Sequence, residues 1–282
     1  MIAFAGNSLL CRLALKQTGI DPASFTFIRL LSGAVVLWLI VKMRPSPGAA
    51  VDDRRLLQGS WPSALALFGY AAAFSFAYVT LSAGTGALLL FGAVQATMIL
   101  WGLLKGERLR ALQMTGLTIA VGGLVVLVFP GLSAPPLAGS LLMLGAGVAW
   151  GIYSLRGKAA GNPAATTAGN FLRAVPLALV LSLALLPWAR LDQAGVGYAV
   201  LSGAIASGLG YVIWYTALPG LKAASAATVQ LSVPVLAAAG GIILLGEPLT
   251  VRFLFATLAV LGGIALVVTS SFPQAAPSTG LD

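Results

Sequence analysis

The sequence of 282 residues contains no histidine and a single cysteine, Cys11. One cysteine cannot form an intramolecular disulfide, and the missing imidazole removes a common general base and metal ligand. Acidic residues are also scarce, with seven in the whole chain, each expected in a loop or at the end of an apolar segment. Paired carboxylates, metal-ligand clusters and a Ser/His pair are therefore missing, so the sequence predicts no enzyme and no bound metal or cofactor.

Charge is equally scarce. Charged residues make up 8% of the chain, against about 25% in a soluble domain. Hydrophobic residues account for 59%, and the mean hydropathy is +0.98. The composition therefore predicts a polytopic protein whose surroundings are the lipid bilayer. The net charge of +9 does not indicate a nucleic-acid partner, because the basic residues gather in loops between apolar runs, where they report membrane orientation.

Long apolar runs dominate what is present. A helix needs about 20 such residues to cross a bilayer. The expected all-α integral membrane protein has ten spans, at residues 2–18, 23–42, 61–82, 85–104, 109–129, 138–157, 164–187, 196–217, 223–245 and 250–270. The polar tail over 272–282 is expected to be disordered.

The loops differ in charge on the two sides of the membrane. Those after the even-numbered spans carry ten lysines and arginines, whereas those after the odd-numbered spans carry Lys16, Arg190 and Arg252, with Arg12 at the edge of one. Because basic loops stay in the cytoplasm, we expect the ten-residue side and both termini to be cytoplasmic. The expected location is a bacterial inner membrane.

One motif occurs twice. Gly106-Glu107-Arg108-Leu109 and Gly246-Glu247-Pro248-Leu249 are 140 residues apart (246 − 106). Such a fixed offset predicts an internal duplication, which we place at residues 1–132 and 137–271 with five spans in each. Because five is odd, the second half enters the membrane from the opposite side. The sequence therefore predicts two inverted-topology repeats, as in many secondary transporters.

The motif residues also carry a family resemblance. Leu231-Ser232-Val233-Pro234-Val235 and Leu245-Gly246-Glu247-Pro248-Leu249-Thr250 resemble the "lsPv…lLGEplt" signature of the EamA branch of the drug/metabolite transporter superfamily. Trp150-Gly151 resembles a further family position, whereas Val94 and Ala5-Gly6 depart from the pattern. The resemblance covers nearly the whole chain and implies ten helices in two inverted repeats. Within the branch the chain is similar to YddG-type exporters, which implies outward movement of amino acids.

Arg29 and Arg173 are the charges expected inside the membrane, 144 residues apart at repeat-related positions (173 − 29). An intramembrane charge is a functional candidate by default. The alternative is a structural tie to the backbone carbonyls of a neighbouring helix. Because the two positions are repeat-related, the structural interpretation is favoured.

Polar and aromatic side chains near the middle of the spans are the candidates for substrate contact. Ser207, Tyr211 and Trp214 are spaced by four and three residues, and Trp150 and Tyr153 by three, so each set shares one helix face. The alternative is that the aromatic rings belong to the membrane–water interface. The predicted substrate-binding set is Tyr78, Gln95, Trp101, Trp150, Tyr153, Ser207, Tyr211 and Trp214.

Together, the residues and the resemblance predict an exporter of small organic metabolites, amino acids first, that works by alternating access. The lack of an intramembrane carboxylate favours facilitative transport over proton coupling. The lack of a mid-span Lys/Arg cluster favours a neutral or zwitterionic substrate. A drug or nucleoside-like efflux protein, a lipid-linked-sugar flippase and a membrane scaffold remain open alternatives. A monomer is compatible with all of these.

Overall fold

The computed structural model describes residues 1–43, 58–106, 108–131, 134–157, 162–217 and 229–269. Within these ranges the secondary structure is helical and includes no strand. The α-helices are α1 (Ile2–Gln17), α2 (Pro22–Met43), α3 (Trp61–Tyr78), α4 (Ala83–Leu104), α5 (Ala111–Val128), α6 (Leu137–Gly157), α7 (Pro163–Ala184), α8 (Gln193–Leu201), α9 (Gly210–Ala217), α11 (Ser232–Leu245) and α12 (Val251–Thr269). A 3₁₀ turn, η2 (Leu186–Trp188), follows α7, and a π-helix, η3 (Ser202–Leu209), joins α8 to α9.

Several helices begin at a polar residue whose side chain caps the first turn. Ser60, Ser82 and Asn162 each accept a hydrogen bond from the backbone N–H three residues further on. Such a cap satisfies one of the N–H groups that a helix start leaves unpaired. At the other end of α11, Gly246 takes a φ of 62°, a conformation that a side chain disfavours.

Seven described helical segments are long and apolar enough to cross a membrane. They include the stretch Gln193–Trp214, in which α8, η3 and most of α9 are continuous. Helices α1 and α11 are shorter, with 16 and 14 residues. The prediction of a helical, multi-pass membrane protein is confirmed. The span expected at 223–245 begins within 218–228, which lies outside the described residues. The expected tail over 272–282 also lies outside them.

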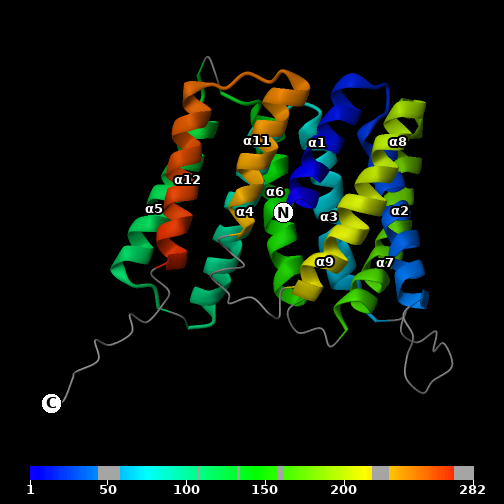
Figure 1. Cartoon of the computed structure of the whole chain (residues 1–282), viewed down its shortest axis with the longest axis horizontal. Coiled ribbons are helices and arrows are strands. Elements are labelled where there is room, and N and C mark those ends of the chain that lie inside the picture. The colour runs from blue at the N-terminus through cyan, green and yellow to red at the C-terminus, as the bar shows by residue number, and fades with distance from the viewer. Residues whose placement is uncertain (44–57, 107, 132–133, 158–161, 218–228, 270–282) are drawn as a thin grey trace.

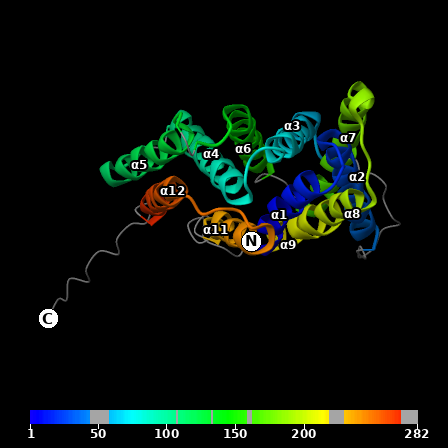
Figure 2. The same ribbon diagram turned by 90° about the horizontal axis from the view of Figure 1, so that it is seen from above.

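The helices form two layers (Figure 2). One layer contains α5, α4, α6, α3 and α7, and the other contains α12, α11, α1, the α8–α9 stretch and α2. The first two helices of each sequence half therefore lie in the layer of the other half. Residues from both halves consequently meet along the middle of the molecule.

The packing is nearly unchanged when the two halves are exchanged. Helix α4 packs on α6 as α11 packs on α1, and α3 packs on α7 as η3 packs on α2. The pairs α5–α12 and α2–α7 each join a helix to its counterpart. Figure 1 shows the turn after α4 at the lower end of the bundle and the turn after α11 at the upper end. Met1 lies near mid-height, and α12 ends at the lower end.

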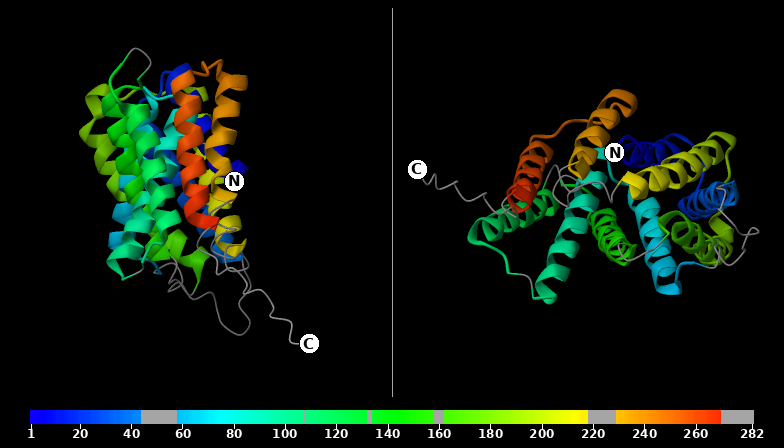
Figure 3. Two further views of the ribbon diagram at one scale, coloured as in Figure 1. Left: turned by 90° about the vertical axis from the view of Figure 1, so that its left-hand side faces the viewer. Right: turned by 60° about the horizontal axis from the view of Figure 1, so that its bottom comes forward.

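Small residues line the contact between α5 and α12, which stand side by side at one end of the molecule (Figure 3). Gly116, Ala120 and Gly123 are buried on one face of α5. A Cβ added to Gly116 would lie 2.6 Å from the carbonyl oxygen of Gly263. Small residues at this contact therefore allow the two backbones to approach closely.

Two expectations about individual spans were wrong in detail. The third span was expected to reach residue 82, but α3 ends at Tyr78 because Ser82 caps the start of α4. The eighth was expected to be a regular α-helix, whereas eight of its residues are π-helical. Apolar periodicity does not report this change, because every residue of the segment is apolar or small.

Candidate functional site

Arg29 is the most deeply buried charge in the part of the chain that the structure describes, with 1% of its surface exposed. Its Nη2 donates to the Tyr70 hydroxyl at 3.0 Å, and its Nε donates to Ser207 Oγ at 3.3 Å. The guanidinium carbon also lies 4.9 Å from the ring centroid of Phe74. One side chain of α2 thus connects α3 of the first half with η3 of the second.

A chain of polar contacts extends from this arginine to α1. Asn7 Nδ2 donates to the Tyr70 hydroxyl at 3.2 Å, and Ser202 Oγ donates to Asn7 Oδ1 at 2.7 Å. Both serines of the network, Ser202 and Ser207, lie on η3. Helices α1, α2, α3 and η3 therefore share one buried hydrogen-bonded cluster.

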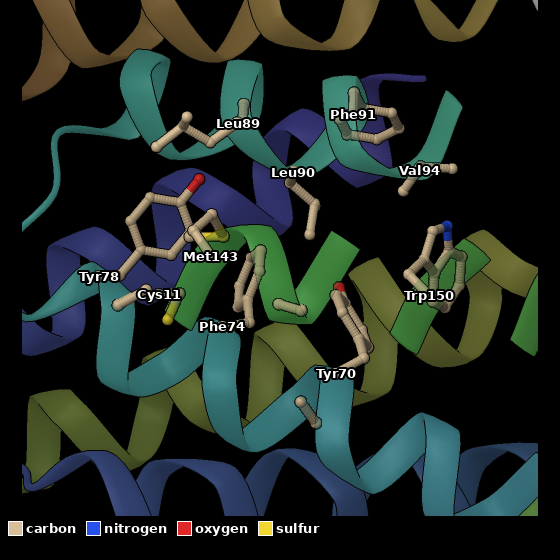
Figure 4. Close-up of a cluster of buried hydrophobic side chains, with 14 of the residues drawn as sticks. Cys11, Tyr70, Phe74, Tyr78, Leu89, Leu90, Phe91, Val94, Met143 and Trp150 are labelled. Carbon is tan, nitrogen blue, oxygen red and sulfur yellow. The ribbon is translucent and has the colours of Figure 1, made fainter. Parts of the chain in front are cut away.

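Aromatic rings pack over the cluster. The Trp150 ring on α6 lies 4.8 Å from the ring of Tyr70 and 5.0 Å from that of Tyr211, between centroids. Phe4 on α1 contacts both Trp150 and Tyr211 edge-on. Figure 4 shows Tyr70 projecting from α3 beside Trp150. The rings come from both halves and close the middle of the molecule to solvent.

The π-helix brings the second half close enough to reach Arg29. A Cβ added to Gly203 would overlap the carbonyl oxygen of Arg29 and the Ser32 hydroxyl. The glycine therefore permits the close contact between α2 and η3. π-helical turns are found frequently at functional sites, and this one carries Ser202 and Ser207 into the polar cluster.

The structure brings six of the eight predicted substrate contacts into or beside this cluster. Ser207 bonds Arg29, and Trp150 and Tyr211 pack in the aromatic layer. Each of the other three contacts an aromatic ring near the cluster. Tyr153 contacts Trp150, Trp214 contacts Phe4, and Tyr78 contacts Phe74.

Trp101 and Gln95 do not join them. Trp101 is 48% exposed near the end of α4 and lines a separate cavity of about 670 Å³ at the lower end of the bundle. Ser63 and Arg156 line the same cavity, and Arg156 Nε donates to Ser63 Oγ at 2.9 Å. Gln95 faces the region between α4, α5 and α12. In this structure these two residues therefore lie apart from Trp150.

Tyr70 was missed in the sequence, although it is the residue that links Arg29, Asn7 and Trp150. The sequence could have indicated Tyr70, because Tyr70, Phe74 and Tyr78 are four residues apart. This spacing places the three rings on one face of α3 (Figure 4). Of the three rings, the predicted substrate-binding set contained Tyr78.

The repeat-related Arg173 has a different role from Arg29. Its Nη1 donates to the carbonyl oxygens of Gln58 and Gly169, at 3.0 and 2.8 Å. These bonds tie Arg173 to a carbonyl of its own helix, α7, and to one in the segment before α3. Arg29 instead bonds two hydroxyls and faces aromatic rings, so the shared structural interpretation does not describe it fully.

A second buried charge lies near the upper end of the bundle. Glu247 Oε1 accepts from Arg12 Nε at 3.0 Å, and Glu247 Oε2 accepts from the backbone N–H of Ala83 at 2.8 Å. Glu247 therefore lies at the first turn of α4, where a carboxylate is favoured.

The site therefore combines one buried cation, neutral hydrogen-bonding groups and several aromatic faces. Such a lining can hold a small molecule by ring contacts and orient it by a few polar groups. Within the described residues no group of acidic or cysteine side chains could hold a metal ion.

Known proteins agree with this architecture. A solved structure titled "Crystal structure of protein" superposes with a TM-score of 0.63 at 17% identity, over 95% of this chain and 97% of that one, which shows a shared fold. An uncharacterized protein of Pseudomonas aeruginosa strain PAO1 is 59% identical over 276 residues, covering 98% of this chain and 94% of its own.

The threonine/homoserine exporter RhtA of Salmonella typhimurium and Escherichia coli is 39% identical over 121 residues, covering 40% of this chain and 39% of its own. The profile of the EamA-like transporter family matches this chain twice, over residues 1–129 and 137–269. The chain is therefore a multi-pass membrane protein that belongs to the EamA-like transporter family.

Proposed function

We propose that this protein exports small neutral or zwitterionic metabolites, amino acids first among them, across a bacterial inner membrane. Two findings support this substrate class. The RhtA proteins, which share 39% identity over 121 residues, are named as threonine/homoserine exporters. The central cluster offers one cation, hydroxyls and aromatic faces, which suit an amino acid of variable side chain.

The proposed mechanism is alternating access between two inverted repeats, 1–132 and 137–271, each with five spans. The observation that carries it is the polar cluster itself, in which Arg29 bonds Tyr70 of the first half and Ser207 of the second. A site between repeats near mid-depth is where inverted-repeat transporters handle substrate. The preserved packing on exchange of the halves supports the same mechanism.

We propose that the lower end of Figure 1, where α2, α4 and α6 end, faces the cytoplasm, because basic loops favour that side. The cavity lined by Ser63 and Arg156 then lies on the cytoplasmic side, and the Arg12–Glu247 pair lies on the outer side. In the proposed mechanism this arrangement is closed toward the outside, where Arg12 ties α1 to Glu247 and to the end of α3. Substrate would next reach the central cluster from the cytoplasm.

We further propose that transport is facilitative. The carboxylates that the structure describes, Asp21, Asp192 and Glu247, lie at helix ends rather than beside Arg29. A proton-coupled exporter usually carries a titrating group within the membrane. Substrate counterflow should therefore persist in liposomes with no imposed pH gradient.

The test is counterflow of labelled threonine, homoserine and a wider amino-acid panel into liposomes that hold the purified protein. We expect accumulation above that of protein-free liposomes for at least one neutral amino acid. Exchange of none of them would overturn the assignment. Exchange that strictly requires a pH gradient would overturn the facilitative mechanism alone.

A second candidate is efflux of planar aromatic compounds or nucleosides. The observation that favours it is the ring layer of Phe4, Tyr70, Trp150 and Tyr211, which offers stacking surfaces. Nucleosides and cationic dyes belong in the same counterflow panel. Their exchange without any amino-acid exchange would select this candidate.

A further inference from the structure

We propose that Nη1 of Arg29 binds the carboxylate of the transported substrate. The inference rests on the proposed export function and names the chemical group that the central site holds. It assigns to Arg29 a contact with substrate in addition to its structural bonds.

The first observation is an unused donor. Nε and Nη2 of Arg29 are both hydrogen-bonded, but Nη1 is buried and has no hydrogen-bond partner among the described residues. Buried polar groups are nearly always paired, and an exception invites an explanation. A substrate oxygen at Nη1 would complete the hydrogen bonding of the guanidinium.

The second observation is an uncompensated charge. Within the described residues, Arg12 forms a salt bridge with Glu247, whereas Arg29 has no carboxylate partner. Two hydroxyls and the faces of Tyr70 and Phe74 hold the guanidinium, and none of these groups carries a negative charge. A carboxylate would neutralise the cation and form a charge-assisted hydrogen bond.

Tyr70 adds a second donor beside the first. Its hydroxyl oxygen accepts from both Asn7 Nδ2 and Arg29 Nη2, so both of its lone pairs are occupied. Its own O–H proton is then directed away from these two groups. Nη1 of Arg29 and the Tyr70 hydroxyl can together hold the two oxygens of one carboxylate.

The surroundings fit the remainder of an amino acid. The Tyr70 ring contacts Arg29 on one side and Trp150 on the other, and Trp150 packs on Tyr211. A carboxylate at Arg29 would therefore place the substrate side chain against these rings. In the closed arrangement the rings fill that space, so separation of α1 and α9 from α3 and α6 must precede binding.

Arg173 supplies a matched comparison within the same chain. It occupies the repeat-related position, but its Nη1 is already bonded to two backbone carbonyls. The same residue type at the repeat-related position therefore ties backbone segments together. Of these two arginines, Arg29 is the one whose Nη1 has no hydrogen-bond partner within the described residues, so this nitrogen can bind a ligand.

The experiment compares an amino acid with its amide, which keeps the side chain and ammonium but loses the carboxylate charge. Threonine and threonine amide, or the best amino acid of the counterflow panel and its amide, compete against labelled substrate in liposomes. We expect the wild type to favour the acid by at least about tenfold, the lower range for a hydrogen bond to a charged group.

Arg29→Gln and Arg29→Met should reduce that preference to about twofold or less, because each removes the cation. Met is included because an apolar residue of similar volume is well tolerated where a buried charge is removed. Arg173→Gln is the matched control and should keep the wild-type preference even if its overall activity falls. Gel filtration and thermal unfolding identify folded variants.

The outcomes separate the two proposals. A wild type that exchanges amino acids without preferring the acid over the amide overturns the Arg29 assignment and leaves export intact. A preference that survives in a folded Arg29→Gln or Arg29→Met protein overturns it as well. If neither variant folds, the wild-type comparison decides. A wild type that exchanges no amino acid overturns both proposals.

Discussion

Arg12 on α1 and Glu247 after α11 form a buried salt bridge, with 3.0 Å between Nε and Oε1, although 235 residues separate them in the sequence. Nη1 of the same arginine donates to the carbonyl oxygens of Tyr78 and Val79 at the end of α3. The pair therefore joins α1, the α3–α4 turn and the α11–α12 turn at the upper end of the bundle.

Removing one partner should destabilise the protein. Glu247→Gln leaves Arg12 buried without its counter-ion, and loss of one partner of a buried pair costs about 3–5 kcal/mol. Thermal unfolding in detergent measures the change. The exposed Lys16→Gln is the control, with an expected change within about 0.5 kcal/mol. Equal melting temperatures for the two variants would show that the pair contributes little.

The aromatic layer should govern substrate affinity. Trp150→Phe and Tyr211→Phe keep a ring in the buried layer but change its size or polarity, and a ring pair contributes about 0.5–1.5 kcal/mol. We expect a severalfold rise in the substrate concentration for half-maximal transport, with little change in expression. Leu258→Ala, at a position 64% exposed, is the control.

Trp101→Phe should resemble that control because Trp101 lies apart from the cluster. If Trp150 and Tyr211 variants also resemble it, the rings serve packing alone, and the substrate site lies elsewhere.

The two Gly-Glu turns should face opposite sides of the membrane. Gly106 and Gly246 have φ angles of 91° and 62°, so cysteines are better placed beside them. In a Cys11→Ala background, Arg108→Cys should react with an impermeant maleimide from the cytoplasmic side and Leu249→Cys from the outside. Labelling of both from one side would contradict the inverted repeats.

Glycines on α5 should differ according to what they face. Gly116→Ala would place a Cβ 2.6 Å from the carbonyl oxygen of Gly263, whereas a Cβ on Gly122 meets nothing within 4 Å. We expect Gly116→Ala to lose about 1–3 kcal/mol, the usual cost of overpacking. Gly122→Ala should be neutral or stabilising. Thermal unfolding of the two variants side by side tests the α5–α12 contact.

Asp21, in the loop before α2, should contribute stability that is lost in acid. Burial alone would raise its pKa, but hydrogen bonds from the Ser24 side chain and the backbone N–H groups of Ser24, Arg190 and Ala23 outweigh it and hold the pKa below 3.8. A lowered pKa means that the contribution is present above pH 3.8 and declines as the pH falls through the folded-state value.

The melting temperature of the wild type should therefore exceed that of Asp21→Asn at neutral pH, and the difference should shrink below pH 3.8. A constant difference down to the lowest accessible pH would show that the carboxylate charge is not what stabilises this loop.

Most of the helical fold was predictable because apolar run length reports it directly. The runs beginning at residues 23 and 61 correspond to α2 and α3, which begin at Pro22 and Trp61. The repeat offset also led to the Gly-Glu turns, which lie at opposite ends of the bundle. These features depend on local composition and on the residue offset between the repeats, and a single sequence contains both.

The site was less predictable because it depends on contacts between distant segments. Trp101 and Trp150 both lie on apolar helices, and sequence spacing does not show that Trp101 lines a cavity apart from the rings around Trp150. In the sequence Glu247 lies in the turn before α12, yet its partners are Arg12 and Ala83, on α1 and α4. Such pairings are set by the layer arrangement.

The π-helix Ser202–Leu209 has a consequence for how the site could vary. An α-helix turns by about 100° for each residue. A π-helix takes about one extra residue to cover the same rotation. If these eight residues adopted α geometry at unchanged length, α9 would therefore rotate by roughly that amount, and Tyr211 would turn away from Trp150. The backbone geometry of η3 thus decides which residues of α9 line the central site, without substitution of any residue that touches the substrate.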